Sequence, residues 1–251
     1  MDLIKWPFLK QSWGMEVVRS EGPYLYTKEG QKILDAAGGA IVSNIGYGRE
    51  EVAEAVKQAT KNNSYVLPPF LTPERESLLD ELREHWLPPH LTRIHLSSGG
   101  SEANESAVKL AIQYQASRGK PEKNIILTRT LSYHGTTLNM SGISGHAARK
   151  RGLESYVPKA PMIETPYPLR CPLGSFHPDA KDYYLDNLKE VIKKIGSENI
   201  AGLLMEPVNG SSGGAISPPE GYWEEAHKIL IDNDILLIAD EVMTGFGRVG
   251  D

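Results

Sequence analysis

The sequence predicts an α/β fold in which a mostly parallel sheet is covered by helices. From Gly46 onward, short apolar runs alternate with segments whose apolar residues recur at helical spacing, and this alternation is typical of strand–helix–strand units. The runs are apolar throughout, as in Ile-Leu-Leu-Ile-Ala at residues 235–239. Strands of that kind are buried on both faces, so helices should lie on both sides of the sheet.

The elements follow one another in a regular order. Residues 24–26 and 32–35, separated by Glu29-Gly30, predict a small hairpin near the N-terminus. Residues 156–182 are rich in proline and glycine, and a loop of that length in a compact domain is either functional or poorly ordered. Helices are predicted around residues 52–59, 78–82, 103–114, 185–195 and 222–231, and strands at residues 94–97, 124–128, 200–205 and 235–239.

Composition excludes several classes of protein. The 251 residues are 40% hydrophobic and 24% charged, with a formal net charge of −5 and no basic cluster that could grip a nucleic acid. Cys171 is the single cysteine, which fits a reducing compartment, so we expect a cytoplasmic location. Residues 1–14 lack the apolar core of a signal peptide, and no stretch approaches the length of a membrane span.

Ligands of parallel sheets bind beyond the carboxyl ends of the strands, so polar residues at those ends are the candidates for a site. Gly100 and Ser101 follow the predicted strand 94–97 and open a helix. Unpaired N–H groups and the positive end of the helix dipole favour an anion such as phosphate there. The alternative is an ordinary N-cap serine on a tight turn. A Walker loop is excluded, because no Gly-Lys-Ser/Thr follows.

Three further strand ends are polar. Tyr133 could stack on a planar ligand and His134 could act as an acid, a base or a donor; the alternative is a packed tyrosine and a surface histidine. Glu206 ends strand 200–205, where a turn carboxylate is the alternative. Asp240 ends strand 235–239 and could hold a positive charge, or could be a helix cap or turn residue. We expect no metal site, since no His or Cys lies near Asp240 and Glu241 at ligand spacing.

Taken together, these strand ends describe a site for a phosphorylated, protonated heteroaromatic ring. Four segments carry a resemblance to a known family: Gly100 to Asn104 (GSEAN), Tyr133 to Gly135 (YHG), Glu206 to Val208 (EPV) and Asp240 to Arg248 (DEVMTGFGR). In this order and spacing they resemble the class III aminotransferases, pyridoxal 5'-phosphate (PLP) enzymes of fold type I. Gly46-Tyr47-Gly48 and Tyr24-Leu25-Tyr26 are similar to that family as well.

The resemblance implies a domain organisation. Residues 1–45 would form the N-terminal segment of the small domain, and residues 46–251 the large PLP-binding domain, which would be incomplete. It also implies a homodimer in the full-length protein, with part of the phosphate site supplied by the other subunit.

The resemblance also implies a role for each candidate residue. Gly100 and Ser101 would hold the cofactor phosphate, and Asp240 would pair with the protonated ring nitrogen. Tyr133 and Val242 would pack on opposite faces of the ring.

Two other residues would lie beside the ring. Glu206 would order the side of the ring that bears the hydroxyl, and His134 would be a neighbour without an assigned task. The partners would be a small-molecule amino donor and a 2-oxo acid.

The family's catalytic lysine is expected a few dozen residues after Asp240, beyond Asp251. None of the lysines present matches it: Lys228 precedes Asp240, and Lys109 lies on the predicted helix after the phosphate turn. We therefore expect no catalytic residue in this chain, and favour a truncated chain, inactive alone, over a natural relative without the lysine.

Two departures from the family's pattern bear on the substrate. Ser211 stands where some members have a second glutamate, and Met243 stands where others often have glutamine. The first departure favours an amine or ω-amino acid donor with pyruvate over a glutamate-gated enzyme. The motifs bind the cofactor without choosing the reaction, so an aminomutase, a racemase, a decarboxylase and a non-catalytic PLP-binding protein are the alternatives.

Overall fold

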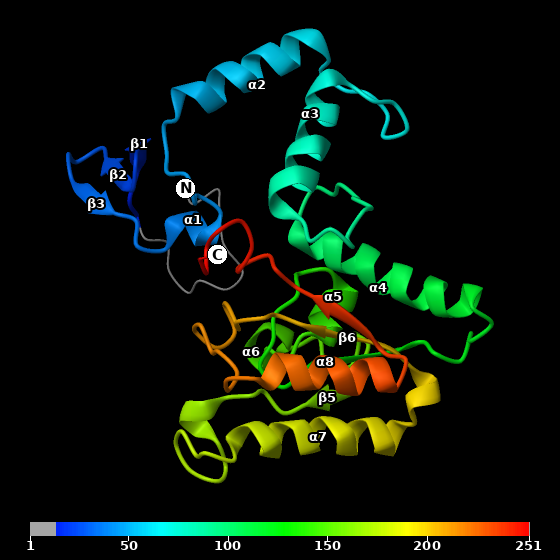
Figure 1. Ribbon diagram of the computed structural model, residues 1–251. Helices are drawn as coiled ribbons and strands as arrows, with labels where there is room; N and C mark the ends of the chain where they lie inside the picture. Colours follow the sequence, from blue (N-terminus) through cyan, green and yellow to red (C-terminus); the bar gives the residue numbers. More distant parts are fainter. Residues whose placement is uncertain (1–13, 251) are drawn as a thin grey trace. The chain divides into compact units, whose positions relative to one another are not determined.

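The computed structural model describes residues 14–250, which divide into two compact units between Thr92 and Arg93 (Figure 1). Most of the segment that was considered for a signal peptide, residues 1–13, lies outside the described residues. The predicted boundary between a small and a large domain, at residues 45 and 46, concerns the complete fold and stays a prediction. Within residues 14–250, none of the helices combines the length and the apolar composition that crossing a bilayer requires.

The first unit, up to Thr92, contains a small antiparallel sheet in the order β1-β2-β3. The predicted hairpin is confirmed as β2 and β3, which pair with Leu25 opposite Ile33. The predicted helices at 52–59 and 78–82 are confirmed as α2 and α3. The bounds are β1 Val17–Glu21, β2 Tyr24–Thr27, β3 Lys32–Leu34, α1 Gly38–Ile41, α2 Glu50–Asn62, α3 Pro73–Glu81 and the π-helical turn η1 Leu82–Trp86.

The first unit has almost no core of its own. Thr27 is its one buried residue among those that the structure describes. Apolar side chains such as Val56, Phe70 and Leu71 are 59–63% exposed. Exposed apolar surface of this extent is typical of a segment that packs against other parts of a larger assembly.

The second unit, from Arg93 onward, contains a parallel four-stranded sheet in the order β5-β4-β6-β7. This confirms the predicted α/β class. Every connection between these strands contains at least one helix, as parallel pairing requires. The bounds are α4 Gly100–Ser117, β4 Ile125–Arg129, α5 Leu138–Ile143, α6 Ala147–Lys150, β5 Met162–Ile163, η2 Pro168–Arg170, α7 Ala180–Ile195, η3 Ser197–Asn199, β6 Ile200–Met205, α8 Tyr222–Asp232 and β7 Leu236–Ala239.

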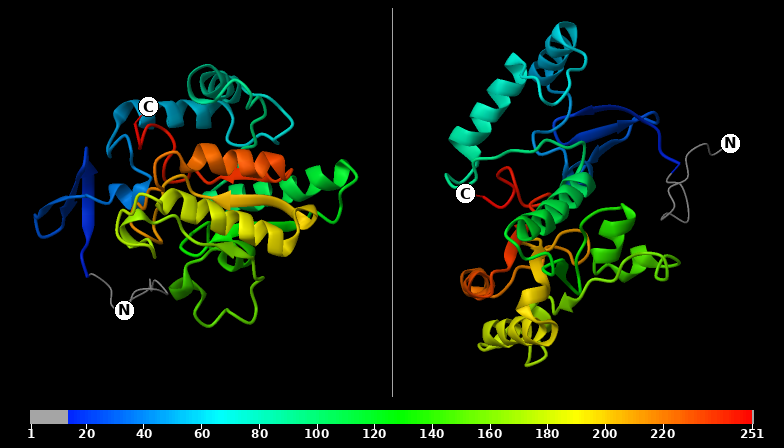
Figure 2. Two further views of the ribbon diagram at one scale, coloured as in Figure 1. Left: turned by 60° about the horizontal axis from the view of Figure 1, so that its bottom comes forward. Right: turned by 90° about the vertical axis from the view of Figure 1, so that its right-hand side faces the viewer.

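Two apolar clusters fill the second unit. Leu127 and Leu203 belong to the cluster that also contains Leu188 of α7 and Leu230 of α8. Their sequence neighbours on the opposite face of the sheet, such as Leu204, pack instead with α4 and α5. The sheet is thus covered by helices on both faces, with α7 and α8 side by side on one of them (Figures 1 and 2).

One predicted strand is wrong. Residues 94–97 form no strand, although their sequence is apolar enough for one. A strand needs a neighbour that takes up its backbone hydrogen bonds, and within residues 14–250 nothing pairs with this segment. The short elements α5, α6 and β5 were not predicted, because each is only two to six residues long and too short for a recognisable period.

The amino edge of the sheet is held by a cluster of ion pairs around Asp234. The carboxylate of Asp234 accepts from Arg118 Nη1 and Lys120 Nζ, each at 2.7 Å, and so ties the end of α4 to the start of β7. The buried Lys123 Nζ donates to the carbonyls of Ser197 and Ile200 at 2.7 and 3.2 Å. Its burial lowers the pKa of Lys123, and this network fixes where β4, β6 and β7 begin.

Replacing Asp234 by asparagine tests this network through pH. Hydrogen bonds from Lys120 and Arg118 lower the pKa of Asp234 from 3.8 to about 2. Because the pKa of Asp234 is lower in the folded than in the unfolded protein, its ionised carboxylate stabilises the fold above pH 3.8. That contribution is lost as the pH falls through 2. D234N should therefore lower the free energy of unfolding near pH 6, by about 1 kcal/mol because the pair is partly exposed. The deficit should disappear near pH 2 in urea titrations.

The control is Asp186→Asn, which removes one negative charge from an exposed pair with Lys189 on α7. A deficit of D234N that remained undiminished at pH 2 would contradict the ion-pair explanation.

The edge strand β7 predicts self-association of the 251-residue chain. Within residues 14–250, β7 pairs only with β6, so its other edge offers free N–H and C=O groups beside half-buried Leu237 and Ile238. Such an edge is a template for pairing with another chain. Sedimentation velocity of the 251-residue chain should show concentration-dependent association, whereas a single monomeric boundary at all concentrations would refute this expectation.

Candidate functional site

Three charged side chains lie at the carboxyl edge of the parallel sheet. Arg129 is the last residue of β4. Met205 and Ala239 are opposite one another in the β6–β7 ladder, so Glu206 and Asp240, the next residues, leave the sheet at neighbouring points. Asp240 N donates to Met205 O at 3.0 Å and extends the ladder by one bond.

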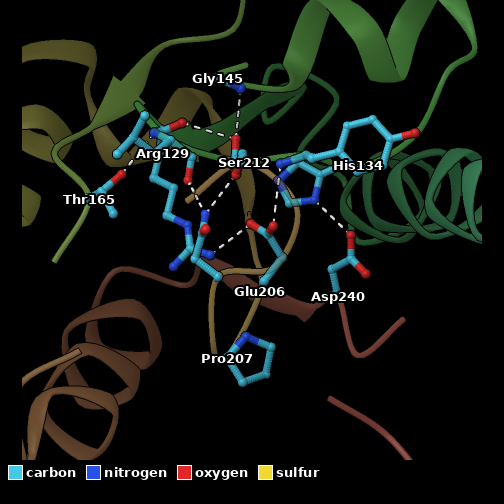
Figure 3. A network of polar contacts seen from close by, with 12 residues as sticks. Arg129, His134, Gly145, Thr165, Glu206, Pro207, Ser212 and Asp240 are labelled. Atoms are coloured by element: carbon cyan, nitrogen blue, oxygen red, sulfur yellow. Dashed lines mark hydrogen bonds and ion pairs between the residues drawn. The ribbon is translucent and has the colours of Figure 1, made fainter. Parts of the chain in front are cut away.

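Asp240 belongs to a buried polar cluster, and Figure 3 shows its contact with the ring of His134. Its Oδ2 accepts from Asn104 Nδ2 and contacts His134 Nδ1, each at 2.8 Å, and its Oδ1 accepts from Val242 N at 3.2 Å. Asn104 Nδ2 also donates to the carbonyl of His134 at 2.9 Å. The residue is only 4% exposed, so α4, the loop after β4 and the end of β7 converge on one carboxylate.

The carboxyl group of Asp240 stays ionised in this buried position. Burial by itself raises the pKa of Asp240, but the hydrogen bond and the attraction from His134 oppose it. Further hydrogen bonds from Val242 N and Asn104 bring the pKa below its ordinary value. Negative charge is therefore available at the carboxyl edge of β7.

The start of α4 lies next to this cluster. Its N-cap residue Gly99 makes no side-chain capping bond, so the helix keeps backbone donors for an anion. Ser101 Oγ accepts from Thr136 N at 3.0 Å. A Cβ at residue 100 would lie 2.9 Å from Val242 Cγ2, and a side chain at residue 135 would overlap Ser101. Glycine at both positions lets the start of α4 lie close to the turn after β7 and to the loop after β4.

Tyr133 and Glu206 meet through the backbone of the loop after β4. Tyr133 N donates to Glu206 Oε1 at 3.3 Å, while Arg129 Nη2 donates to Glu206 Oε2 at 2.7 Å. Arg129 and Glu206 are both buried, and among residues 14–250 the Arg129 Nε–H has no hydrogen-bond partner. The guanidinium of Arg149 lies 4.2 Å from the centre of the Tyr133 ring.

The loop after β6 packs against the turn after β7. Asn209 Nδ2 donates to Leu131 O at 2.6 Å, which ties this loop to the one after β4. The sulfur of Met243 occupies the space where a side chain at Gly210 would be. A pocket of about 540 Å³ opens at the same edge of the sheet, with Leu131, Thr165 and Ser212 in its lining, but none of the seven predicted site residues lines it.

The structure thus brings together the predicted residues that come from separate strand ends. Ser101 bonds to the loop that carries Tyr133 and His134, and His134 bonds to Asp240. Gly100 and Val242 are neighbours, and Glu206 reaches the same loop from the other side.

Sequence reasoning missed Arg129 and Asn104. A signal was present for Asn104, because it shares the buried face of α4 with Val108, Ala111 and Gln115, where a polar residue needs a partner. Arg129 also gave a signal, since it ends an apolar strand. Its pairing with Glu206 depends on strand register.

This donor set fits a phosphorylated, protonated pyridine ring such as PLP. An ionised, buried carboxylate suits a ring cation, and an uncapped helix start with a serine hydroxyl suits a phosphate. The buried clusters hold both features in one unit of the chain.

Comparison with known proteins agrees with this chemistry. The profile of the family described as "Aminotransferase class-III" matches residues 10–251. The uncharacterized aminotransferase YodT of Bacillus subtilis is 37% identical over 234 residues, which are 92% of this chain and 52% of YodT. A putrescine–pyruvate aminotransferase of Pseudomonas aeruginosa is 33% identical over 238 residues, 94% of this chain and 52% of that enzyme.

Solved structures give the same result. An (S)-enantioselective omega-transaminase from Thermomicrobium roseum superposes with a TM-score of 0.87 at 36% identity, over 93% of this chain and 52% of that one. A PLP-bound amine transaminase from an uncultivated Pseudomonas species gives a TM-score of 0.88 at 30% identity, over 98% and 57%. The chain spans about half the length of the curated relatives it matches. From its sequence and its fold, the chain belongs to the class III aminotransferase family.

Proposed function

We propose that this chain is the cofactor-binding part of an aminotransferase that moves an amino group from an amine or amino acid to a 2-oxo acid. The observation that carries the proposal is the buried, ionised Asp240, held by His134 and Asn104 beside the start of α4. A carboxylate held in this way can keep a pyridine ring protonated. When bound, PLP supplies an electron-poor ring that stabilises negative charge on a substrate carbon.

Each predicted residue has a task in this proposal. Asp240 would accept a hydrogen bond from the protonated ring nitrogen, and the backbone donors at Gly100 and Ser101, with the Ser101 hydroxyl, would bind the phosphate. Tyr133 and Val242 pack on the two faces of the ring, and His134 positions Asp240. Val242 is 59% exposed. Its apolar side chain is therefore accessible to a bound ring, which supports the proposed packing.

Glu206 has an ordering task. Its two oxygens are engaged by Arg129 Nη2 and Tyr133 N, so the carboxylate fixes the loop that carries Tyr133. Both carboxylate oxygens are thus occupied by contacts within the chain. Holding Tyr133 in place is the task that these contacts support.

For the substrates, we propose an amine or ω-amino acid donor and pyruvate as acceptor. Ser211, in place of a gating glutamate, supports this choice. So do two relatives, the putrescine–pyruvate aminotransferase and the amine transaminase, although a diaminobutyrate–2-oxoglutarate transaminase of Halomonas elongata is 32% identical as well.

The complete protein would also supply what this chain lacks. We propose that the half present in relatives and absent here contributes the catalytic lysine. We also propose a cytoplasmic homodimer, which the exposed apolar side chains of the first unit support.

Asp240→Asn tests the proposed function. The complete protein with PLP should transfer amino groups from primary amines to pyruvate, measured as alanine formed. D240N replaces a charged acceptor by a neutral one, so pyridoxamine 5'-phosphate should bind about 10- to 100-fold more weakly, and amino transfer should fall by at least as much. Asp234→Asn, at the opposite edge of the sheet, is the matched control.

Wild-type-like affinity in D240N would refute the assigned role of Asp240. Turnover of amines without any amino transfer to pyruvate or 2-oxoglutarate would instead favour a mutase, racemase or decarboxylase.

A covalent labelling experiment tests the position of the lysine. After loading with PLP and reduction with borohydride, peptide mass spectrometry of the complete protein should find one modified lysine in the sequence after Asp251. When excess PLP is removed before reduction, the 251-residue chain should show no lysine modified close to one equivalent, because exposed lysines such as Lys109 and Lys228 form only readily dissociating imines. A complete coding sequence without such a lysine would favour the non-catalytic PLP-binding alternative.

A further inference from the structure

A chain of two buried hydroxyl groups, those of Ser132 and Thr128, leads to the Nε2 atom of His134. Thr128 Oγ1 lies 3.3 Å from His134 Nε2 and 3.1 Å from Ser132 Oγ. Thr128 and Ser132 are fully buried and His134 is 2% exposed. Neither hydroxyl has a task in the proposed function, yet together they govern what the second ring nitrogen of His134 can do.

The directions of these hydrogen bonds follow from the number of hydrogens available. Ser132 Oγ accepts from Gly145 N at 2.8 Å and donates its one hydrogen to Arg129 O at 3.0 Å. Toward Thr128 it can therefore only accept. In this arrangement the hydrogen of Thr128 is directed at Ser132, and Thr128 presents a lone pair to His134 Nε2, which then donates a proton to it.

The other nitrogen of His134 faces an acceptor too. Asp240 Oδ2 is an ionised carboxylate oxygen, so His134 Nδ1 donates to it at 2.8 Å. An acceptor at each nitrogen is the pattern that suits a ring protonated on both nitrogens and paired with Asp240.

A second arrangement of hydrogens fits the same heavy atoms. If Ser132 donates to Thr128 and Thr128 donates to His134 Nε2, His134 keeps only the proton on Nδ1 and is neutral. Arg129 O loses the Ser132 donor in exchange. Rotating two hydroxyl groups thus accommodates the loss of one proton without any movement of the chain.

We propose that His134 is a cation in the cofactor-free site and releases one proton to solvent when a protonated pyridine ring binds at Asp240, the Thr128 and Ser132 hydroxyls reversing as it does. This inference rests on the proposed function. Two cations that share one buried carboxylate repel each other strongly in a poorly hydrated site. Thr128 and Ser132 are then positioning residues that set the charge of His134.

The neighbouring charges do not compensate for a second cation. Arg129 and Glu206 neutralise each other at 2.7 Å. Glu105 of α4 accepts from Thr137 and Asn139. On the other elements around the loop, Lys150 of α6 donates to Gly142 O at 2.9 Å, and Arg149 lies over the Tyr133 ring. In the part of the chain that the structure describes, only Asp240 forms an ion pair with His134.

Proton counting by calorimetry tests the inference. Pyridoxamine 5'-phosphate is titrated into the complete protein in buffers of different ionisation enthalpy, which gives the protons released per bound molecule. Protons that come from the ligand itself are the same for all variants. Wild type should release about one proton more than Thr128→Val, in which His134 Nε2 has lost its acceptor.

Two variants make the comparison specific. Thr128→Ser keeps the hydroxyl and should behave like wild type. Thr130→Val, which removes the hydroxyl two residues further along the chain, one that is hydrogen-bonded to Thr165, should also match wild type. Ser132→Ala frees the Thr128 hydroxyl to donate to Nε2 and should match Thr128→Val, so the test survives if Thr128→Val does not fold.

Nitrogen NMR of protein labelled with ¹⁵N-histidine gives a direct readout. The His134 ring, identified by its loss in His134→Gln, should show two protonated nitrogens before pyridoxamine 5'-phosphate is added and one afterwards. In Ser132→Ala it should show one throughout.

The outcomes separate the two proposals. Equal proton release in wild type, Thr128→Val and Ser132→Ala, or a His134 ring that does not change on binding, would overturn the inference and leave the proposed function standing. Absence of any binding of pyridoxamine 5'-phosphate would overturn both.

Discussion

Charged side chains buried at the carboxyl edge of the parallel sheet must each have a partner, and the loops of the second unit are arranged to supply one. Asp240 is paired with His134 and Asn104, and Arg129 with Glu206. Removing one member of such a pair leaves an uncompensated buried charge, which costs several kcal/mol. Because the members come from β4, α4 and the ends of β6 and β7, the same contacts that satisfy the charges also fix the geometry of the site.

Much of this arrangement could be predicted from the sequence. Apolar runs and helical spacing predicted β6, α4 and α7, since buried strands and amphipathic helices leave a periodic trace. The convergence of Ser101, His134 and Asp240 could also be predicted, because the carboxyl ends of parallel strands meet at one edge. Their tasks toward a cofactor stay predictions.

The remainder depends on contacts that sequence patterns do not encode. The pairing of Arg129 with Glu206 requires β4 beside β6 in a particular register. The directions of the hydroxyl hydrogens at Thr128 and Ser132 follow only from counting donors in three dimensions. The strand expected at residues 94–97 is absent because strand formation needs a pairing partner as well as suitable residues.

The contact between Gly210 and Met243 has a consequence for how this family can diverge. The methionine sulfur fills the volume that any side chain at 210 would occupy, and these two residues lie in loops that follow different strands. A larger residue at 210 requires either a different rotamer of Met243 or a shorter residue at 243. Exchanges at the two positions are therefore epistatic, and homologous sequences should covary there. Libraries that randomise residue 243 to alter substrate range should vary residue 210 at the same time.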